Sequence, residues 1–335
     1  MELPTLQGGP SPAMNGTLSN VSASSPGRVF LLMGFPGLES APYWLAFPVC
    51  LAFLLSALGN GSILLLLWLE TSLHAPMYLL LGMLAACDLG LSTALLPTML
   101  QVFLLGSRAI GEAACFSQLF FIHSFSIMES SVLLAMAIDR FVAICHPLRY
   151  ASIITNARLV QVGLAIVLRG LALHFPIPFL LKRLTFCRPS LLSFSYCLHP
   201  DIMKLACQKP SLVAIYGLLV VFSTMGLDPI LIVLSYACIL KTILGISLLE
   251  ERHKALNTCA CHISVVLLFY SPMLALSLLS RLRVRVPPFL HVLFSYLHFL
   301  APPLINPVLY CVKMKEVRRI IAAKVAGTQT GRWEG

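Results

Sequence analysis

Long apolar blocks alternate with short polar stretches along the chain. Seven of these blocks are long enough to cross about 30 Å of hydrocarbon as helices. They cover residues 43–69, 76–103, 115–145, 157–181, 211–240, 255–280 and 287–312. The pattern predicts an all-α membrane protein with a seven-transmembrane helix bundle at residues 43–312, a leader at residues 1–42 and a tail at residues 313–335.

The leader and the tail differ in amino-acid composition. The leader is rich in Pro, Ser and Gly, shows no signal-peptide pattern, and carries N-glycosylation sequons at Asn15 and Asn20. The tail mixes basic and apolar residues, which is typical of a short amphipathic helix on an anionic lipid surface. The basic residues are Lys313, Lys315, Arg318, Arg319 and Lys324. Because seven spans place the ends on opposite sides, we expect an extracellular N-terminus and a cytosolic C-terminus.

Composition narrows the class of protein. The 335 residues are 58% hydrophobic and only 11% charged, which excludes a soluble globular protein. The formal net charge of +10 is scattered between apolar blocks, so a nucleic-acid partner is not expected. The 11 cysteines lack the paired CxxC spacing of a zinc site, and we therefore expect no structural metal.

Four cysteines fall where the polar end of the bundle is predicted. Cys187, Cys197 and Cys207 lie in the long connection at residues 182–209, and Cys115 begins the third span. In an oxidising compartment these four can form two disulfides. Spacing alone leaves all three pairings open.

An acid and a base follow a run of about twenty mostly apolar residues in the third span. The segment MAIDRFVAICHPLRY, residues 136–150, places Asp139 and Arg140 where a membrane helix reaches the polar interface. This position suggests a conformational switch. The alternative is that both are ordinary charges at a helix end.

Five strings occur together in the order expected of one family. They are LHAPMYLLL (73–81), MAIDRFVAICHPLRY (136–150), SY (235–236), KALNTCACH (254–262) and PPLINPVLY (302–310). With them the chain resembles an olfactory receptor, a rhodopsin-like G-protein-coupled receptor. The segment Phe269-Tyr270-Ser271-Pro272 and a fourth span without Trp are similar to this family. GFPGLE (34–39), Arg169-Gly170 and KALNTC are similar to its class I, or fish-like, branch.

The resemblance assigns roles to the cysteines and to the charged pair. It implies the disulfides Cys115–Cys197 and Cys187–Cys207. It also implies that Asp139 holds Arg140 in the resting state. On activation, Arg140 would contact a G protein while Tyr236 and Tyr310 move toward it. Position 141 is Phe where the family usually has Tyr, which leaves the efficiency of coupling open.

Polar residues inside the spans are costly and therefore candidate functional groups. The resemblance implies that Asn60, Asp88 and Asn306 meet in the bundle interior around water or a sodium ion. Glu129 lies ten residues before Asp139, on nearly the same helix face, and is expected to join this network. The alternative is a hydrogen-bond cluster that serves structure alone.

The ligand pocket is expected between the outer halves of the third, fifth, sixth and seventh spans. The resemblance makes Arg281 the candidate anchor for a carboxylate, with Ser277, His123 and His199 as polar wall residues. The alternatives are a solvated basic loop for Arg281 and purely structural roles for the two histidines. Pro200 stands where many relatives have Gln.

These observations lead to an odorant receptor in the plasma membrane, with no enzymatic activity and no cofactor. Its expected partners are a small volatile or short-chain acid-like odorant, membrane lipid, and a stimulatory, olfactory-type G protein that raises cyclic AMP. A transporter is an alternative, but it predicts internal repeats, which we do not detect. An intramembrane enzyme would need a string such as GxSxG or HExxH, and neither occurs. A receptor relic without signalling is a further alternative, suggested only by Phe141.

Overall fold

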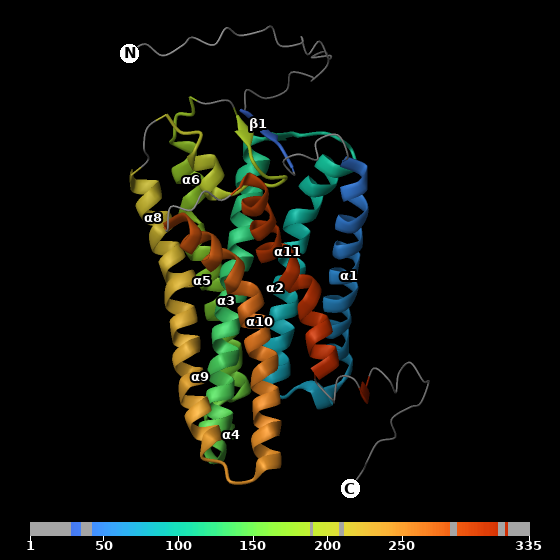
Figure 1. Cartoon of the computed structure of the whole chain (residues 1–335), viewed down its shortest axis with the longest axis vertical. Helices are drawn as coiled ribbons and strands as arrows, with labels where there is room; N and C mark the ends of the chain where they lie inside the picture. Colours follow the sequence, from blue (N-terminus) through green and yellow to red (C-terminus); the bar gives the residue numbers. More distant parts are fainter. Residues whose placement is uncertain are drawn as a thin grey trace, which may run out of the picture.

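The computed structural model describes residues 28–34, 42–187, 190–207, 211–281, 287–313 and 319–320. Within them, seven helical segments are long and apolar enough to cross a membrane, as the pattern predicts. They stand side by side, with β1 (Val29–Leu32) and α6 (Pro176–Lys182) at one end of the bundle and α4 (Tyr150–Ile153) at the other (Figure 1). The main helices are α1 (Pro42–Leu69), α2 (Pro76–Phe103), α3 (Glu112–Cys145), α5 (Asn156–His174), α6 (Pro176–Lys182), α8 (Ser211–Val221), α9 (Asp228–Leu244), α10 (Leu249–Arg281) and α11 (Pro288–Lys313).

Two spans are interrupted where the sequence places proline. The fourth span divides into α5 and α6 at Phe175, because Pro176 has no N–H to continue the helical ladder. The fifth span contains a π-helical turn, η3 (Phe222–Leu227), immediately before Asp228 and Pro229. Such a turn widens the helix locally and is frequent at functional sites.

The helices at the α4 end run beyond their apolar blocks. α9 continues to Leu244 and α10 begins at Leu249, whereas the apolar blocks end at 240 and begin at 255. Hydropathy marks only the part of a helix that crosses lipid, and a helix can continue into water on local propensity. A short helix, α4 (Tyr150–Ile153), follows a 3₁₀ turn (Pro147–Arg149) after α3.

A three-stranded sheet covers the other end of the bundle, and the sequence analysis did not predict it. β1 (Val29–Leu32) pairs antiparallel with β2 (Ala109–Gly111) and parallel with β3 (Leu191–Leu192). Phe30 and Leu32 point into the protein with no exposed surface, while Val29 and Leu31 face outward. All four residues of β1 are apolar, so the alternation that marks a half-buried strand is invisible in the sequence.

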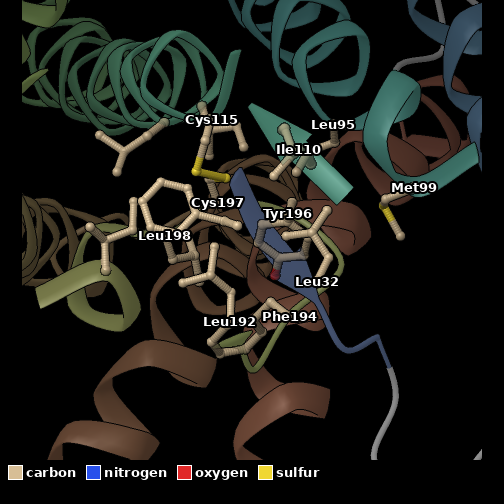
Figure 2. Close-up of a cluster of buried hydrophobic side chains, with 14 of the residues drawn as sticks. Leu32, Leu95, Met99, Ile110, Cys115, Leu192, Phe194, Tyr196, Cys197 and Leu198 are labelled. Carbon is tan, nitrogen blue, oxygen red and sulfur yellow. A yellow bond between two sulfur atoms is a disulfide. The ribbon is translucent and has the colours of Figure 1, made fainter. Parts of the chain in front are cut away.

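Below the sheet lies the outer hydrophobic core. Leu32, Leu192 and Tyr196 gather around the disulfide Cys115–Cys197, which ties the start of α3 to the long connection (Figure 2). A second disulfide, Cys187–Cys207, closes that connection on itself. This is the pairing that the resemblance implies.

Most of the leader and the tail lies outside the described residues. The sequons at Asn15 and Asn20 belong to this part, and so does nearly all of the predicted amphipathic helix. Arg319 and Ile320 are helical, and Ile320 is buried against Leu73, which follows α1. The division into leader, bundle and tail therefore stays a prediction.

A glycine allows α3 and α5 to approach closely. A Cβ atom added at Gly170 would lie 2.5 Å from Met128 Cγ and 2.9 Å from the carbonyl oxygen of Ser124. The second contact is with backbone and cannot be relieved by a side-chain rotation. Gly170 therefore sets the distance between α3 and α5 beside Arg169.

We expect Gly170→Ala to destabilise the protein by about 1–3 kcal/mol, because overpacking forces the two helices apart. Thermal unfolding of the detergent-solubilised protein measures this loss. Gly61→Ala is the matched control, since a Cβ there meets nothing within 4 Å. Equal melting temperatures for the two variants would contradict the proposed close packing.

Candidate ligand pocket and signalling site

Arg140 is held by its neighbour at the end of α3 that lies near α4. Asp139 Oδ2 accepts hydrogen bonds from Arg140 Nε at 3.0 Å and Nη2 at 2.5 Å. The hydroxyl of Tyr150 donates to Asp139 Oδ1 at 2.7 Å. Burial raises the pKa of Tyr150 above its ordinary value, so this hydroxyl stays protonated and remains a donor. Asp139 therefore has both carboxylate oxygens occupied and keeps the guanidinium folded back.

Tyr310 and Arg140 line the same small cavity, together with Met136 and His262. Tyr310 donates a long hydrogen bond of 3.9 Å to the sulfur of Met136. Tyr236 is hydrogen-bonded to His262 Nδ1 at 2.6 Å instead of reaching Arg140. Asp139, Arg140 and Tyr310 thus line one small cavity, and the hydrogen bond from His262 connects Tyr236, the fourth predicted switch residue, to it.

Asn60, Asp88 and Asn306 join three helices in the middle of the bundle. Asn306 Nδ2 donates to Asp88 Oδ2 at 3.0 Å, and Asn60 Nδ2 donates to the Pro303 carbonyl at 2.8 Å. That carbonyl is available because Pro307, four residues later, has no N–H to donate to it. The proline in α11 therefore creates the acceptor that binds α1.

Glu129 lies close enough to Asp88 for the two carboxyl groups to interact electrostatically, and both side chains are fully buried. Neither oxygen of Glu129 has a hydrogen-bond partner among the described residues, and Oδ1 of Asp88, Asn60 and Asn306 has none either. Two buried carboxylates repel one another unless a proton or a cation is shared between them. These oxygen donors suit a hard cation such as sodium.

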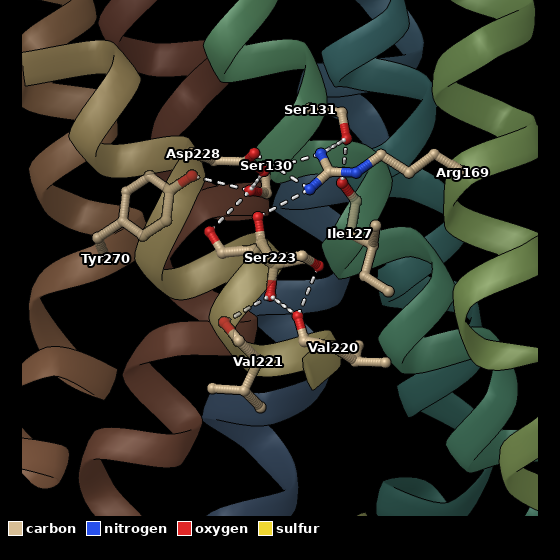
Figure 3. Close-up of polar contacts among 10 residues, drawn as sticks. Ile127, Ser130, Ser131, Arg169, Val220, Val221, Ser223, Asp228 and Tyr270 are labelled. Atoms are coloured by element: carbon tan, nitrogen blue, oxygen red, sulfur yellow. Dashed lines mark hydrogen bonds and ion pairs between the residues drawn. The ribbon is translucent and has the colours of Figure 1, made fainter. Parts of the chain in front are cut away.

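A third polar cluster connects α3, α5, α9 and α10 (Figure 3). Arg169 forms a two-pronged ion pair with Asp228, at 2.9 Å and 3.1 Å. It also donates to Ser131 Oγ at 2.6 Å and to the Ser223 carbonyl in the π-helical turn at 2.9 Å. Asp228 is 3% exposed, so Arg169 is placed as the counter-charge of a carboxylate inside the membrane.

Ser130 extends the cluster to α10. Its hydroxyl donates to Asp228 Oδ2 at 2.6 Å and lies 2.8 Å from the hydroxyl of Tyr270. Tyr270 belongs to the Phe-Tyr-Ser-Pro segment of the sixth span. A shift of α10 therefore changes the surroundings of the ion pair between Arg169 and Asp228.

A cavity of about 140 Å³ lies between this cluster and the sheet end. His123 from α3 and His199 from α7 (His199–Met203) both line it, as does Pro200. The other lining residues are Ser126, Ile127, His174, Ile177, Gly217, Val220, Val221, Thr224, Met225, Met273, Leu274, His298 and Phe299. The side chains of Ser277 and Arg281 lie outside the described residues, so their ligand contacts stay predictions.

Comparison of the sequence with known proteins identifies one family. The family model described as "Olfactory receptor" matches residues 49–327. The chain belongs to the olfactory receptor family. Human (Homo sapiens) Olfactory receptor 51G2 is 52% identical over 90% of this chain and 96% of its own length. Olfactory receptor 51S1 and Olfactory receptor 51L1, also human, are 49% and 47% identical over 92% and 90% of this chain, and each is covered over 96% of its length.

Membership of the olfactory receptor family excludes two of the alternatives. An olfactory receptor is a multi-pass plasma-membrane receptor for odorants that couples to G proteins, and it is not an enzyme. The prediction of a class I receptor is confirmed by the relatives, and the transporter and enzyme alternatives fall away.

The packing of Phe141 explains why this olfactory receptor can carry Phe at position 141, where the family usually has Tyr. Its half-buried ring packs against the apolar cluster of Ile239, Ile243 and Cys259 and lies 5.6 Å from the ring of His146. The hydroxyl that donates to Asp139 belongs to Tyr150 instead. A phenolic hydroxyl at position 141 is therefore not needed to hold Arg140.

Sequence reasoning did not assign four further residues of the receptor. Arg169 served only as a branch marker, and Asp228, His174 and His298 were not singled out. Each is an ionisable residue inside a predicted span, which is the signal that was available for all four. Among the described His, Cys, Asp and Glu side chains, no group of three or more is placed to hold a metal ion.

Proposed function

We propose that this olfactory receptor binds a small odorant, of the short-chain acid-like class, in the cavity at the sheet end, and activates a stimulatory, olfactory-type G protein. The observation that supports this most directly is the restrained Arg140. Its guanidinium is tied to Asp139, which Tyr150 also binds, as a resting state requires. Release of this arginine would expose a positive charge to an incoming G-protein helix.

The polar cluster in the bundle provides the connection between the two ends. The cavity is lined by Thr224 of the π-helical turn, next to the Ser223 carbonyl that binds Arg169. Tyr270 of α10 contacts the same cluster through Ser130. A ligand that binds one arrangement of α9 and α10 more tightly shifts the population toward it. The shift is limited by the difference in affinity between the two states.

We also propose that the sheet end is extracellular and the α4 end cytosolic. The sequons of the leader and the basic tail support this orientation. It places the disulfides in the oxidising compartment and Arg140 beside the G protein. Arg281 remains a predicted carboxylate anchor, and the two buried carboxyls at Asp88 and Glu129 remain a proposed sodium or proton site.

Arg140→Ala is expected to abolish the cyclic AMP response to odorants, because the charge that contacts the G protein is gone. The measurement is a cyclic AMP reporter in cells exposed to short-chain acids and other odorants. An antibody against an N-terminal tag on intact cells normalises surface expression and tests the orientation. Arg149→Ala, an exposed arginine nearby, is the control and should respond as wild type. Normal signalling by Arg140→Ala at equal surface expression would refute the switch.

A further inference from the structure

His174 is buried without a hydrogen-bond partner. It ends α5, just before the break at Phe175, and its side chain is 4% exposed. Neither Nδ1 nor Nε2 has a partner among the described residues, although the ring lines the cavity. Leaving a buried polar group unpaired costs free energy, and most such groups in folded proteins are satisfied. A ligand in the cavity would satisfy this one.

Two other imidazoles face the same space. The ring of His123 stacks on that of His174, with centroids 4.7 Å apart and planes 17° apart. His199 interacts electrostatically with both, and its Nε2 is also buried without a described partner. Three elements, α3, α5 and α7, thus bring their imidazoles to one wall of the cavity.

The hydrogen bond of His123 fixes which of its nitrogens is the acceptor. Nδ1 of His123 lies 2.9 Å from the Leu119 carbonyl, which can only accept, so Nδ1 carries the proton and Nε2 accepts when the ring is neutral. Burial, and then the proximity of His123, lowers the pKa of His199 to about 4. Its ring is therefore uncharged near pH 7 and prefers a partner that brings a proton.

The groups around the three imidazoles supply no competing charge. On α11, His298 Nδ1 lies 2.8 Å from the Phe269 carbonyl, and on α8 the Tyr216 hydroxyl donates to the Leu173 carbonyl at 2.9 Å. α6 and α10 contribute apolar residues to the cavity. No described lining residue carries a carboxyl, ammonium or guanidinium group. Further along α5, Arg169 is already paired with Asp228.

We propose that His123, His174 and His199 bind a short-chain carboxylic acid together with its proton. In the bound complex the acid keeps its O–H bond and donates it to a neutral imidazole nitrogen, so neither partner carries a charge inside the cavity. This inference rests on the proposed function and names the residues, and the protonation state, through which the acid-like ligand binds. The cavity of about 140 Å³ is below the roughly 300–1,000 Å³ of pockets for drug-sized molecules, which limits the acid to a short chain.

The proposal has a definite pH dependence. A free carboxylic acid has a pKa of about 4, so above pH 6 it is almost entirely carboxylate in solution. Binding then takes up one proton from solvent. Because the complex holds one more proton than its separate components, the apparent Kd rises about tenfold for each pH unit. An arginine anchor such as Arg281 stays charged over this range and would give a Kd independent of pH.

The test measures binding of butanoic and hexanoic acid to the purified receptor at pH 6.5, 7.0, 7.5 and 8.0. The ligand-induced rise in melting temperature gives the apparent Kd. For wild type, we expect the acids to bind about tenfold more weakly per pH unit, and 1-butanol and 1-hexanol to show no such slope. His174→Phe, which keeps a ring, and His174→Gln should each weaken acid binding about tenfold or more at pH 6.5. His253→Gln, an exposed histidine of α10, should bind as wild type.

Three results would overturn the proposal: a flat acid Kd, no acid binding at pH 6.5, or unchanged acid binding in both His174 variants. A flat profile lost in Arg281→Ala would assign the carboxylate to Arg281 instead. Each of these leaves odorant signalling intact. Failure of the proposed function appears separately, as normal signalling by Arg140→Ala.

Discussion

Arg169→Ala should remove most of the receptor from the cell surface and destabilise it by about 3–5 kcal/mol. Arg169 makes the two-pronged ion pair with Asp228, whose side chain is only 3% exposed. Without the guanidinium, a carboxylate is left unpaired among apolar helices, and breaking a buried pair on one side typically costs this much. Flow cytometry and thermal unfolding of the solubilised receptor measure the loss.

The double variant Arg169→Met and Asp228→Leu distinguishes two contributions to stability. One is the cost of leaving Asp228 without its partner, and the other is the net stabilisation by the ion pair itself. Replacing both partners of a buried ion pair by apolar residues is often neutral or stabilising. We expect the double variant to regain much of the stability, yet to signal poorly because the contact from Asp228 to Ser130 is lost. Arg158→Ala, an exposed arginine of the same helix, is the control. A double variant as unstable as the single one would show that the pair itself stabilises the fold.

Cys115→Ala should cause a loss of similar size at the sheet end. The Cys115–Cys197 disulfide joins residues 82 apart, and the chain-entropy relation gives up to about 4.5 kcal/mol for such a loop. Lost packing adds to this loss of stability, because both cysteines are fully buried in the outer core. The Cys197 N–H also donates to Gln118 Oε1 at 3.0 Å, which links the connection to α3 a second time. Surface expression and melting temperature report the effect.

The second disulfide provides the comparison. Cys187 and Cys207 are 20 residues apart, for which the same relation gives about 3 kcal/mol. Cys187→Ala should therefore be milder than Cys115→Ala, and adding Cys197→Ala to Cys115→Ala should cost little more. A larger loss from Cys187→Ala would mean that the short connection, and not the link to α3, limits the stability of this end.

Sequence alone predicted those features that the membrane determines, namely the seven spans and the charged pair at the end of one of them. A helix that crosses lipid must be predominantly apolar over about 20 residues, so the seven spans could be predicted from hydropathy. The Asp139–Arg140 pair was recognisable because adjacent charges at the end of such a span are conspicuous. The cysteine pairing came from resemblance to a family, since spacing left three pairings open.

Contacts between residues on different helices could not be predicted from the sequence. Arg169 and Asp228 are 59 residues apart, and only the packing of the fourth and fifth spans shows that they meet. Likewise, the stacking of His174 on His123 depends on where α5 breaks at Phe175. The proline was visible, but the side of the helix that it would turn toward α3 was not.

The position of β1 has a consequence for biosynthesis. Val29–Leu32 leaves the ribosome before any membrane span, whereas its partner strands at Ala109–Gly111 and Leu191–Leu192 are made much later. Until then, the backbone N–H and C=O groups of this apolar segment have no partner strand. Unpaired strand edges of this kind favour aggregation. The roof of the receptor is therefore completed only after four spans have been synthesised. A chaperone that covers this nascent strand would raise the yield of folded receptor.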